Sequence, residues 1–140
     1  MTSPVVANRN RWLAAIGYGL LAEVCTILTI ILVVSVYRYV IAPGLSGDAY
    51  TAFGQKVGGV IGIIGGTLFT YLFARLLMRR VSGNFIAHGV VLAITAIALS
   101  VGGSIAGHQG VPSGYILASI LKLLAGWFAG FQAQKPATVG

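Results

Sequence analysis

The stretch WLAAIGYGLLAEVCTILTIILVVSVYRYVI, residues 12–41, decides the fold of this chain. About 20 mostly apolar residues in a helix cross the roughly 30 Å hydrocarbon core of a bilayer, and this stretch is longer than that. As a helix it would span about 45 Å, so we expect it to tilt or to project beyond the bilayer. It is also much longer than the apolar region of a signal peptide, and we therefore interpret it as a retained first transmembrane helix.

Three more segments, at about residues 57–78, 85–106 and 115–131, are long and apolar enough to span a membrane. The breaks between the four segments are rich in proline, glycine, serine and asparagine, which favour turns. The sequence predicts an all-α, polytopic integral membrane protein in which residues 1–140 form one compact bundle of four transmembrane helices.

The composition supports this class. Of the 140 residues, 57% are apolar and 8% are charged, whereas a soluble domain has about 25% charged residues. Intrinsic disorder is excluded by the same values, and the one cysteine excludes an internal disulfide framework. The net charge of +7 does not indicate nucleic-acid binding, because the basic residues are few and flank apolar segments.

The basic residues predict the orientation of the helices. Arg9, Arg11, Arg79, Arg80 and Lys135 fall on one side of the membrane, with Arg75 one turn inside the second helix, while the other side receives Arg38 and Lys56. Because short cytoplasmic flanks are enriched in lysine and arginine, we expect both termini in the cytoplasm, and the bacterial inner membrane as the location.

Glycines spaced by four residues predict close helix packing. Gly58, Gly62 and Gly66 share one face of the second helix, and Gly126 and Gly130 repeat the spacing on the fourth. Such faces let another backbone approach closely in lipid. We expect packing within the four-helix bundle, or alternatively contact with another subunit, so that the lipid bilayer and a homo- or hetero-oligomer are the expected partners.

Glu23 and Lys122 are ionisable residues inside predicted transmembrane helices, where such groups are rare and usually paired or functional. Glu23 lies about 16 Å and Lys122 about 14 Å above the same membrane edge, which places both near the midplane. The first and fourth helices of a small bundle can be neighbours, so an ion pair between them is possible. Thr26, Thr29 and Ser119 are candidate hydroxyl donors near it.

Three interpretations of the two charges remain open. In the first, they form an ion pair that fixes the helix arrangement. In the second, Glu23 is a proton or cation site on a transport path, for which Lys122 or a substrate competes. In the third interpretation each charge pairs with a different protein, as in an accessory subunit.

The run Leu20-Leu21-Ala22-Glu23-Val24, followed by Cys25-Thr26, resembles the first helix of the small multidrug resistance transporters. The resemblance implies a glutamate that exchanges protons for cationic drugs within a dimer of four-helix subunits. The chain is longer than members of that family, and Lys122 would neutralise the negative site, so we do not assign it to the family.

Histidines, serines and the cysteine give little basis for a cofactor or for catalysis. His88 and His108 lie at opposite ends of the third segment, about 30 Å apart, so they cannot ligate one haem iron within a chain. Ser100 and Ser104 have only His108 nearby, with no acidic third member of a triad. We expect no cofactor, no metal site and no enzyme activity.

The sequence therefore favours a non-catalytic subunit or accessory protein of a membrane assembly, with a Glu23–Lys122 pair inside the membrane. The alternative is a small oligomeric transporter, coupled to protons or cations, that uses Glu23.

Overall fold

A computed structural model describes residues 4–107 and 113–134, with side chains from residue 11 onward. Helix α1 (Pro4–Val36) continues into a π-helical turn, η1 (Tyr37–Ile41), and is followed by α2 (Gly47–Met78), α3 (Phe85–Ala106) and α4 (Ser113–Gln134). All four α-helices are long and apolar enough to cross a membrane. The predicted all-α bundle of four such helices is confirmed, and it indicates an integral membrane protein.

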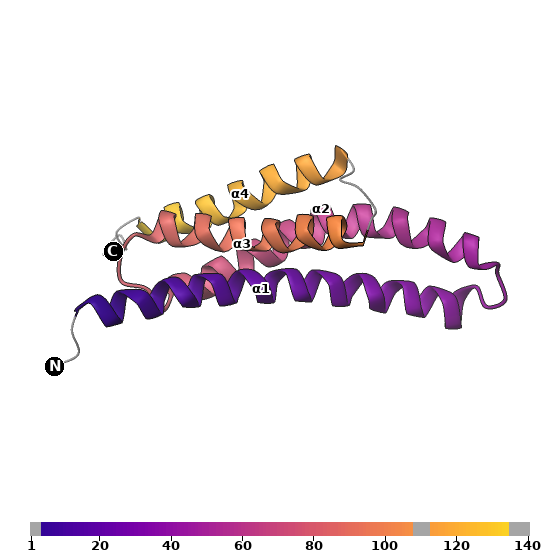
Figure 1. The fold of residues 1–140 in the computed structure, drawn as a ribbon, viewed down its shortest axis with the longest axis horizontal. Helices are drawn as coiled ribbons and strands as arrows, with labels where there is room; N and C mark the ends of the chain where they lie inside the picture. The colour runs from indigo at the N-terminus through magenta and orange to yellow at the C-terminus, as the bar shows by residue number, and fades with distance from the viewer. Residues whose placement is uncertain (1–3, 108–112, 135–140) are drawn as a thin grey trace, which may run out of the picture.

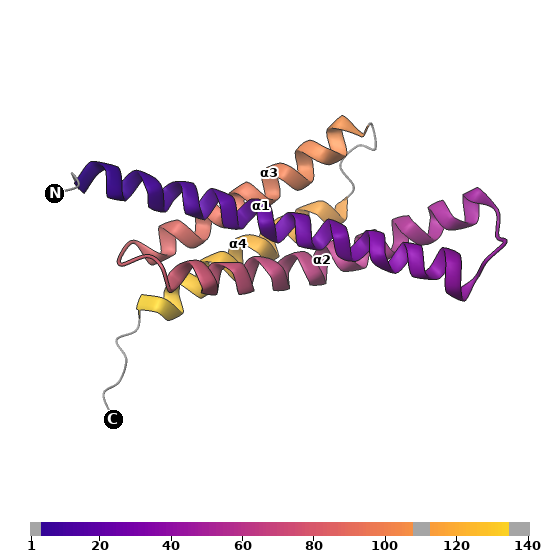
Figure 2. The same ribbon diagram turned by 90° about the horizontal axis from the view of Figure 1, so that it is seen from below.

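The helices form two antiparallel hairpins that pack side by side (Figure 1). Helix α1 packs against α2 and α3, and α4 packs against the same two helices. Helices α1 and α4 therefore occupy opposite corners of the bundle, which Figure 2 shows from a second side. The sequence allowed these two helices to be neighbours, but the structure makes them diagonal.

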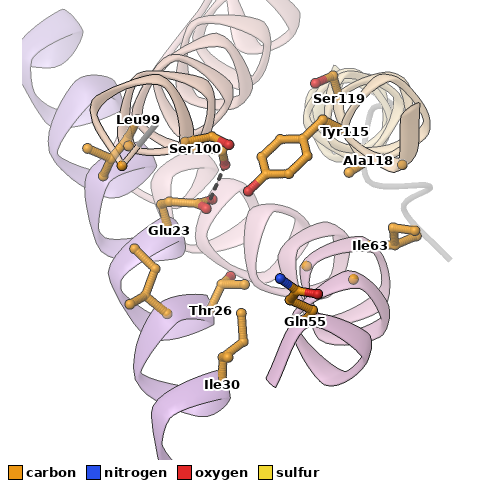
Figure 3. Close-up of a pocket in the computed structure, with 18 of the residues that line it drawn as sticks. Glu23, Thr26, Ile30, Gln55, Ile63, Leu99, Ser100, Tyr115, Ala118 and Ser119 are labelled. Carbon is orange, nitrogen blue, oxygen red and sulfur yellow. Dashed lines mark hydrogen bonds between the residues drawn. The ribbon is translucent and has the colours of Figure 1, made fainter. Parts of the chain in front are cut away.

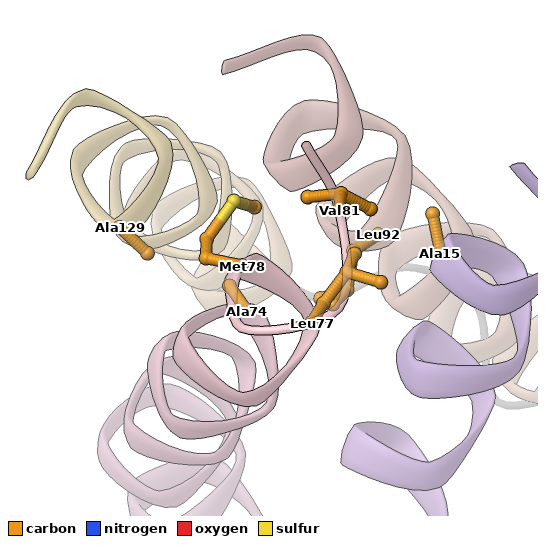
Figure 4. Close-up of a cluster of buried hydrophobic side chains, with 7 residues drawn as sticks. All are labelled: Ala15, Ala74, Leu77, Met78, Val81, Leu92 and Ala129. Carbon is orange, nitrogen blue, oxygen red and sulfur yellow. The ribbon is translucent and has the colours of Figure 1, made fainter. Parts of the chain in front are cut away.

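The half of the bundle nearest the two termini is tightly packed, and we call it the packed half. Its centre is a cluster of mostly small or unbranched side chains (Figure 4). The cluster consists of Ala15, Ala74, Leu77, Met78, Val81, Leu92 and Ala129. Small residues let helices approach closely, and in lipid this van der Waals contact takes the place of the hydrophobic effect between helices.

The other half, between the bundle centre and the α1–α2 turn, we call the hollow half. Helix α2 begins at Gly47 rather than near residue 57, so the expected outer loop of residues 42–56 is mostly helical. The helix starts there because the Ser46 side chain accepts a hydrogen bond from the Ala49 amide and Asp48 lies in the first turn. As a result, the α1–α2 hairpin extends past the ends of α3 and α4 (Figure 1).

Candidate functional site

Three polar side chains from three helices meet at the boundary between the two halves. Lys122 Nζ of α4 lies 2.6 Å from Glu23 Oε2 of α1. The Ser100 hydroxyl of α3 lies 2.6 Å from Glu23 Oε1, to which it can donate, and Lys122 Nζ donates to the Ser100 oxygen at 2.7 Å. We call Glu23, Ser100 and Lys122 the axial triad. Figure 3 shows Glu23 and Ser100 directed toward each other from facing helices.

The ion pair connects the two helices that do not pack against each other. Because α1 and α4 lie at opposite corners, the Glu23 and Lys122 side chains have to cross the centre of the bundle to meet. Both residues are buried, with 6% of Glu23 and 3% of Lys122 exposed. A buried charge needs a compensating partner in such a place, and here each charge has one.

Gly66 of α2 provides the space through which the lysine passes. A Cβ atom at this position would lie 2.8 Å from Lys122 Cε, closer than side chains tolerate. The sequence assigned Gly66 to helix packing, and in the structure it accommodates the aliphatic part of a charged side chain. A larger residue here would require the flexible end of the Lys122 side chain to shift.

The hydroxyl that joins the pair is not one of those expected from the sequence. Thr26 donates to the Ala22 carbonyl at 2.9 Å and Thr29 to the Cys25 carbonyl at 2.8 Å, so both hydroxyls bond to the backbone of their own helix. Ser119 lines a cavity instead of joining the triad. A signal for Ser100 was present in the sequence, since small or polar residues recur every three or four positions on one face of α3. These residues are Gly89, Ala93, Ala96, Ser100 and Ser104.

A cavity of about 980 Å³ occupies the hollow half, and the axial triad forms part of its lining. Figure 3 shows Glu23 and Ser100 among the residues around it. Its walls come from all four helices and are largely aliphatic or glycine, with a smaller set of polar side chains. The polar residues outside the triad are Thr26, Thr51, Gln55, Ser104, Tyr115 and Ser119. Ligand pockets have volumes of about 300–1,000 Å³, apolar walls and few polar groups, so this cavity has the properties of a binding site.

The glycines expected to pack helices divide between the two halves. At Gly130 of α4 a Cβ atom would lie 2.6 Å from the Ile86 Cα of α3, and a Cβ at Gly126 would overlap the Gly89 carbonyl. Gly58 and Gly62, in contrast, line the cavity, and a Cβ placed on either would lie more than 4 Å from every described atom outside its own stretch of helix. Gly126 and Gly130 therefore pack within the bundle, whereas Gly58 and Gly62 make no such contact with another described helix. The alternative, contact of the α2 glycines with another subunit, stays a prediction.

His88 is buried in the packed half, away from the axial triad. Its ring stacks on Trp12 with a centroid distance of 4.2 Å, and its Nδ1 lies 2.9 Å from the Asn84 carbonyl. Because a carbonyl only accepts, Nδ1 carries the proton, and Nε2 has no hydrogen-bond partner among the described residues. His108 lies outside the described residues, so the structure adds nothing on the two-histidine arrangement considered from the sequence.

The chemistry available at the site is charge pairing and hydrogen bonding. The described residues contain no group of three or more histidine, cysteine, aspartate or glutamate side chains that could hold a metal ion. The absence of a cofactor and of enzyme activity stays a prediction.

No family model, no curated protein and no solved structure matches this chain.

Proposed function

We propose that this chain is a small non-enzymatic carrier in which a solute enters the hollow half and binds at the axial triad. One observation is the main support: the large cavity reaches a buried charge pair at the centre of the bundle. A purely structural ion pair needs no such space beside it. The cavity beside the pair therefore supports a transporter rather than an accessory subunit.

The packed half explains why a carrier fits better than an open channel. Beyond the triad the helices touch through Gly126 and Gly130, and the cluster around Leu77 and Leu92 fills the centre. The cavity thus lies on one side of the triad, and on the other side the packed helices fill the centre of the bundle. This is the geometry expected for one state of a carrier whose bound solute is exposed to one side at a time.

We further propose that the packed half faces the cytoplasm of a bacterium and that both termini lie inside. In the packed half, Arg79 and Arg80 follow the end of α2, Arg75 is one turn inside α2, and Arg11 of α1 donates to Ser82 in the turn after α2. In the hollow half, Arg38 lies in η1 and Lys56 lies within α2. The positive-inside rule supports this orientation, which would make the cavity accessible from outside the inner membrane.

Glu23 is the proposed coupling residue because it is the carboxylate at the cavity floor. A proton or cation that binds there replaces the charge of Lys122, so the two compete for the same oxygens. Each such exchange alters the contact that joins α1 to α4 across the bundle. Coupling between ion binding and helix arrangement would follow from this competition.

The test is proton flux into vesicles that contain the purified chain and a trapped pH-sensitive dye. With a potassium diffusion potential that is negative inside, we expect the lumen to acidify faster than in protein-free vesicles. Glu23→Gln should abolish the difference, whereas Asp48→Asn, the matched change at the exposed acidic residue of α2, should preserve it. Flux equal to that of empty vesicles, or unchanged in Glu23→Gln, would refute proton coupling.

A subunit of a membrane assembly is the second candidate, and the projecting α1–α2 hairpin favours it. Tyr39, Val40 and Ile41 in η1 are 72%, 73% and 67% exposed at the end of this hairpin. In Val40→Cys, on a Cys25→Ser background, oxidative cross-linking of the chain to itself in membranes would support a homo-oligomer. A chain that stays monomeric under oxidation would argue against contact at this surface.

A further inference from the structure

We propose that the cavity binds a zwitterion, a molecule in which an ammonium and a carboxylate lie close together and are attached to an apolar body. This inference depends on the proposed binding site and names the class of solute that it takes. It follows from the charges at the cavity floor and from the apolar nature of the walls.

The floor presents one negative and one positive group in direct contact, with Glu23 Oε2 and Lys122 Nζ 2.6 Å apart. A solute with only a positive charge that displaces Lys122 from Glu23 leaves the Lys122 ammonium without its carboxylate in a buried position. A solute with only a negative charge that pairs with Lys122 leaves the Glu23 carboxylate buried without its ammonium partner. Uncompensated charges of this kind are costly, so each of these solutes binds less favourably than one that compensates both charges.

A zwitterion avoids this cost because it exchanges partners with the pair. Its ammonium takes the place of the Lys122 ammonium at Glu23, and its carboxylate takes the place of the Glu23 carboxylate at Lys122. Four charges then form two compensated contacts, and no buried charge loses a partner. Charge complementarity thus favours the zwitterion over either singly charged analogue.

Ser100 is suited to the same exchange. Its hydroxyl is within donating distance of Glu23 and accepts from Lys122 in the structure, and a hydroxyl can also donate to a carboxylate or accept from an ammonium of a ligand. The group therefore has a partner before and after the exchange. A methyl group at this position would provide neither contact.

The walls determine the rest of the ligand. Ile27, Ile30, Ile63 and Leu99 supply aliphatic surface above the triad, and Gly58 and Gly62 leave space beside α2. Such surface stabilises an apolar group but gives few hydrogen bonds. The site therefore fits an amino acid with an apolar side chain better than a small hydrophilic one such as glycine.

The experiment compares three probes that share one apolar body. Thermal unfolding of the full chain in detergent is measured with phenylalanine, with phenethylamine, which lacks the carboxylate, and with 3-phenylpropionate, which lacks the ammonium. Leucine, isopentylamine and 4-methylpentanoate form a second set. Because a ligand that binds the folded state raises Tm, we expect a rise of about 3 °C or more with at least one zwitterion and none with its analogues at equal concentration.

Substitutions at two adjacent residues of α2 test whether the rise in Tm comes from binding in the cavity. Ile63→Trp places a large side chain into the cavity and should abolish the rise in Tm, while Ile64→Trp is the matched control because Ile64 is 66% exposed on the outer surface of α2. A rise in both variants would place binding elsewhere and overturn the inference. Loss in Ile63→Trp alone would support it.

The outcomes separate this inference from the proposed carrier function. A rise with the amine that equals the rise with the zwitterion overturns the inference and leaves a cation-binding carrier. No rise with either set overturns it as well. Zwitterion binding at the cavity without proton flux in the vesicles supports the inference and refutes proton-coupled transport.

Discussion

In the packed half, adjacent helices touch backbone to backbone, whereas in the hollow half the same four helices surround a cavity of about 980 Å³. Both halves contain glycines at a spacing of four, so the spacing alone does not decide between contact and space. Gly126 lies opposite Gly89 of α3 and allows a close approach. Gly62 has no such partner and borders the cavity.

The axial triad lies where the two arrangements meet, and its geometry accounts for the change. Glu23 and Lys122 have to reach across the diagonal, which keeps two long side chains in the centre of the bundle. Small side chains let the helices converge on one side of this level. On the other side, the helices surround the cavity, and the triad forms its floor.

Removing one charge of the axial pair should give the largest effect on stability. Glu23→Leu or Lys122→Leu leaves the other charge buried without a partner, and we expect each to lower the free energy of unfolding by about 3–5 kcal/mol. The double substitution should recover most of this loss, because an apolar pair has no desolvation cost. Thermal or denaturant unfolding in detergent measures all three variants.

Arg38→Leu is the control for loss of a cation, since Arg38 is exposed, and it should change stability by about 1 kcal/mol or less. If the losses of the two single variants simply add in the double variant, the charges do not stabilise each other. The Glu23–Lys122 pair would then not account for the change from the packed half to the hollow half at its position in the bundle.

The next largest effect is the difference between two glycine-to-alanine substitutions, one in each half. Gly89→Ala places a methyl group against the Gly126 backbone of α4, and overpacking of this kind costs about 1–3 kcal/mol. Gly62→Ala meets no described atom within 4 Å outside its own stretch of helix and should be neutral or stabilising by up to about 1 kcal/mol, as alanine favours helix. Unfolding measurements that gave equal losses would contradict the distinction between the halves.

Much of this organisation could be predicted from the sequence. Hydropathy gave the four spans because about 20 apolar residues are needed to cross a bilayer, and residues 85–106 coincide with α3. Glu23 and Lys122 were recognisable because ionisable residues within such spans are rare. The extension of α2 back to Gly47 was indicated only by Ser46 and Asp48, since the polar residues that follow weaken the apolar signal.

The interior arrangement could not be predicted in the same way. Which helices lie diagonally depends on how two hairpins pack together, and periodicity along one helix does not determine this. For that reason Ser100 was not recognised as part of the site, although its face of α3 was marked by small residues. The cavity depends on all four helices at once and has no signature in any one of them.

Substitutions of Ser100 test whether the triad acts as a unit, and we expect them to lower stability less than removal of either charge. Ser100→Ala removes the hydroxyl shared by Glu23 and Lys122, and we expect a loss of about 1–2 kcal/mol. Ser100→Thr retains the hydroxyl and should recover part of the loss. Ser119→Ala, on the cavity wall of α4, should stay within about 0.5 kcal/mol of wild type, and a larger loss there than at Ser100 would argue against the triad as the supporting contact.

The smallest effect concerns the end of the projecting hairpin, which lies beyond the hollow half. The Tyr50 hydroxyl donates to the Ala42 carbonyl at 2.8 Å and accepts from the Leu45 amide at 3.0 Å, so it closes the turn between η1 and α2. Tyr50→Phe removes both bonds and retains the ring that meets Tyr37 edge to face. We expect faster hydrogen exchange at the Leu45 amide with a change in Tm below about 1 °C, because an exposed turn opens locally without unfolding the bundle.

Tyr71→Phe is the matched control in the packed half, where Tyr71 donates to Gln132 at 2.9 Å, and it should leave exchange at Leu45 unchanged. A drop of several degrees in Tm for Tyr50→Phe would mean that the hairpin end and the packed half unfold together, and the hollow half would then be a rigid part of one cooperative unit.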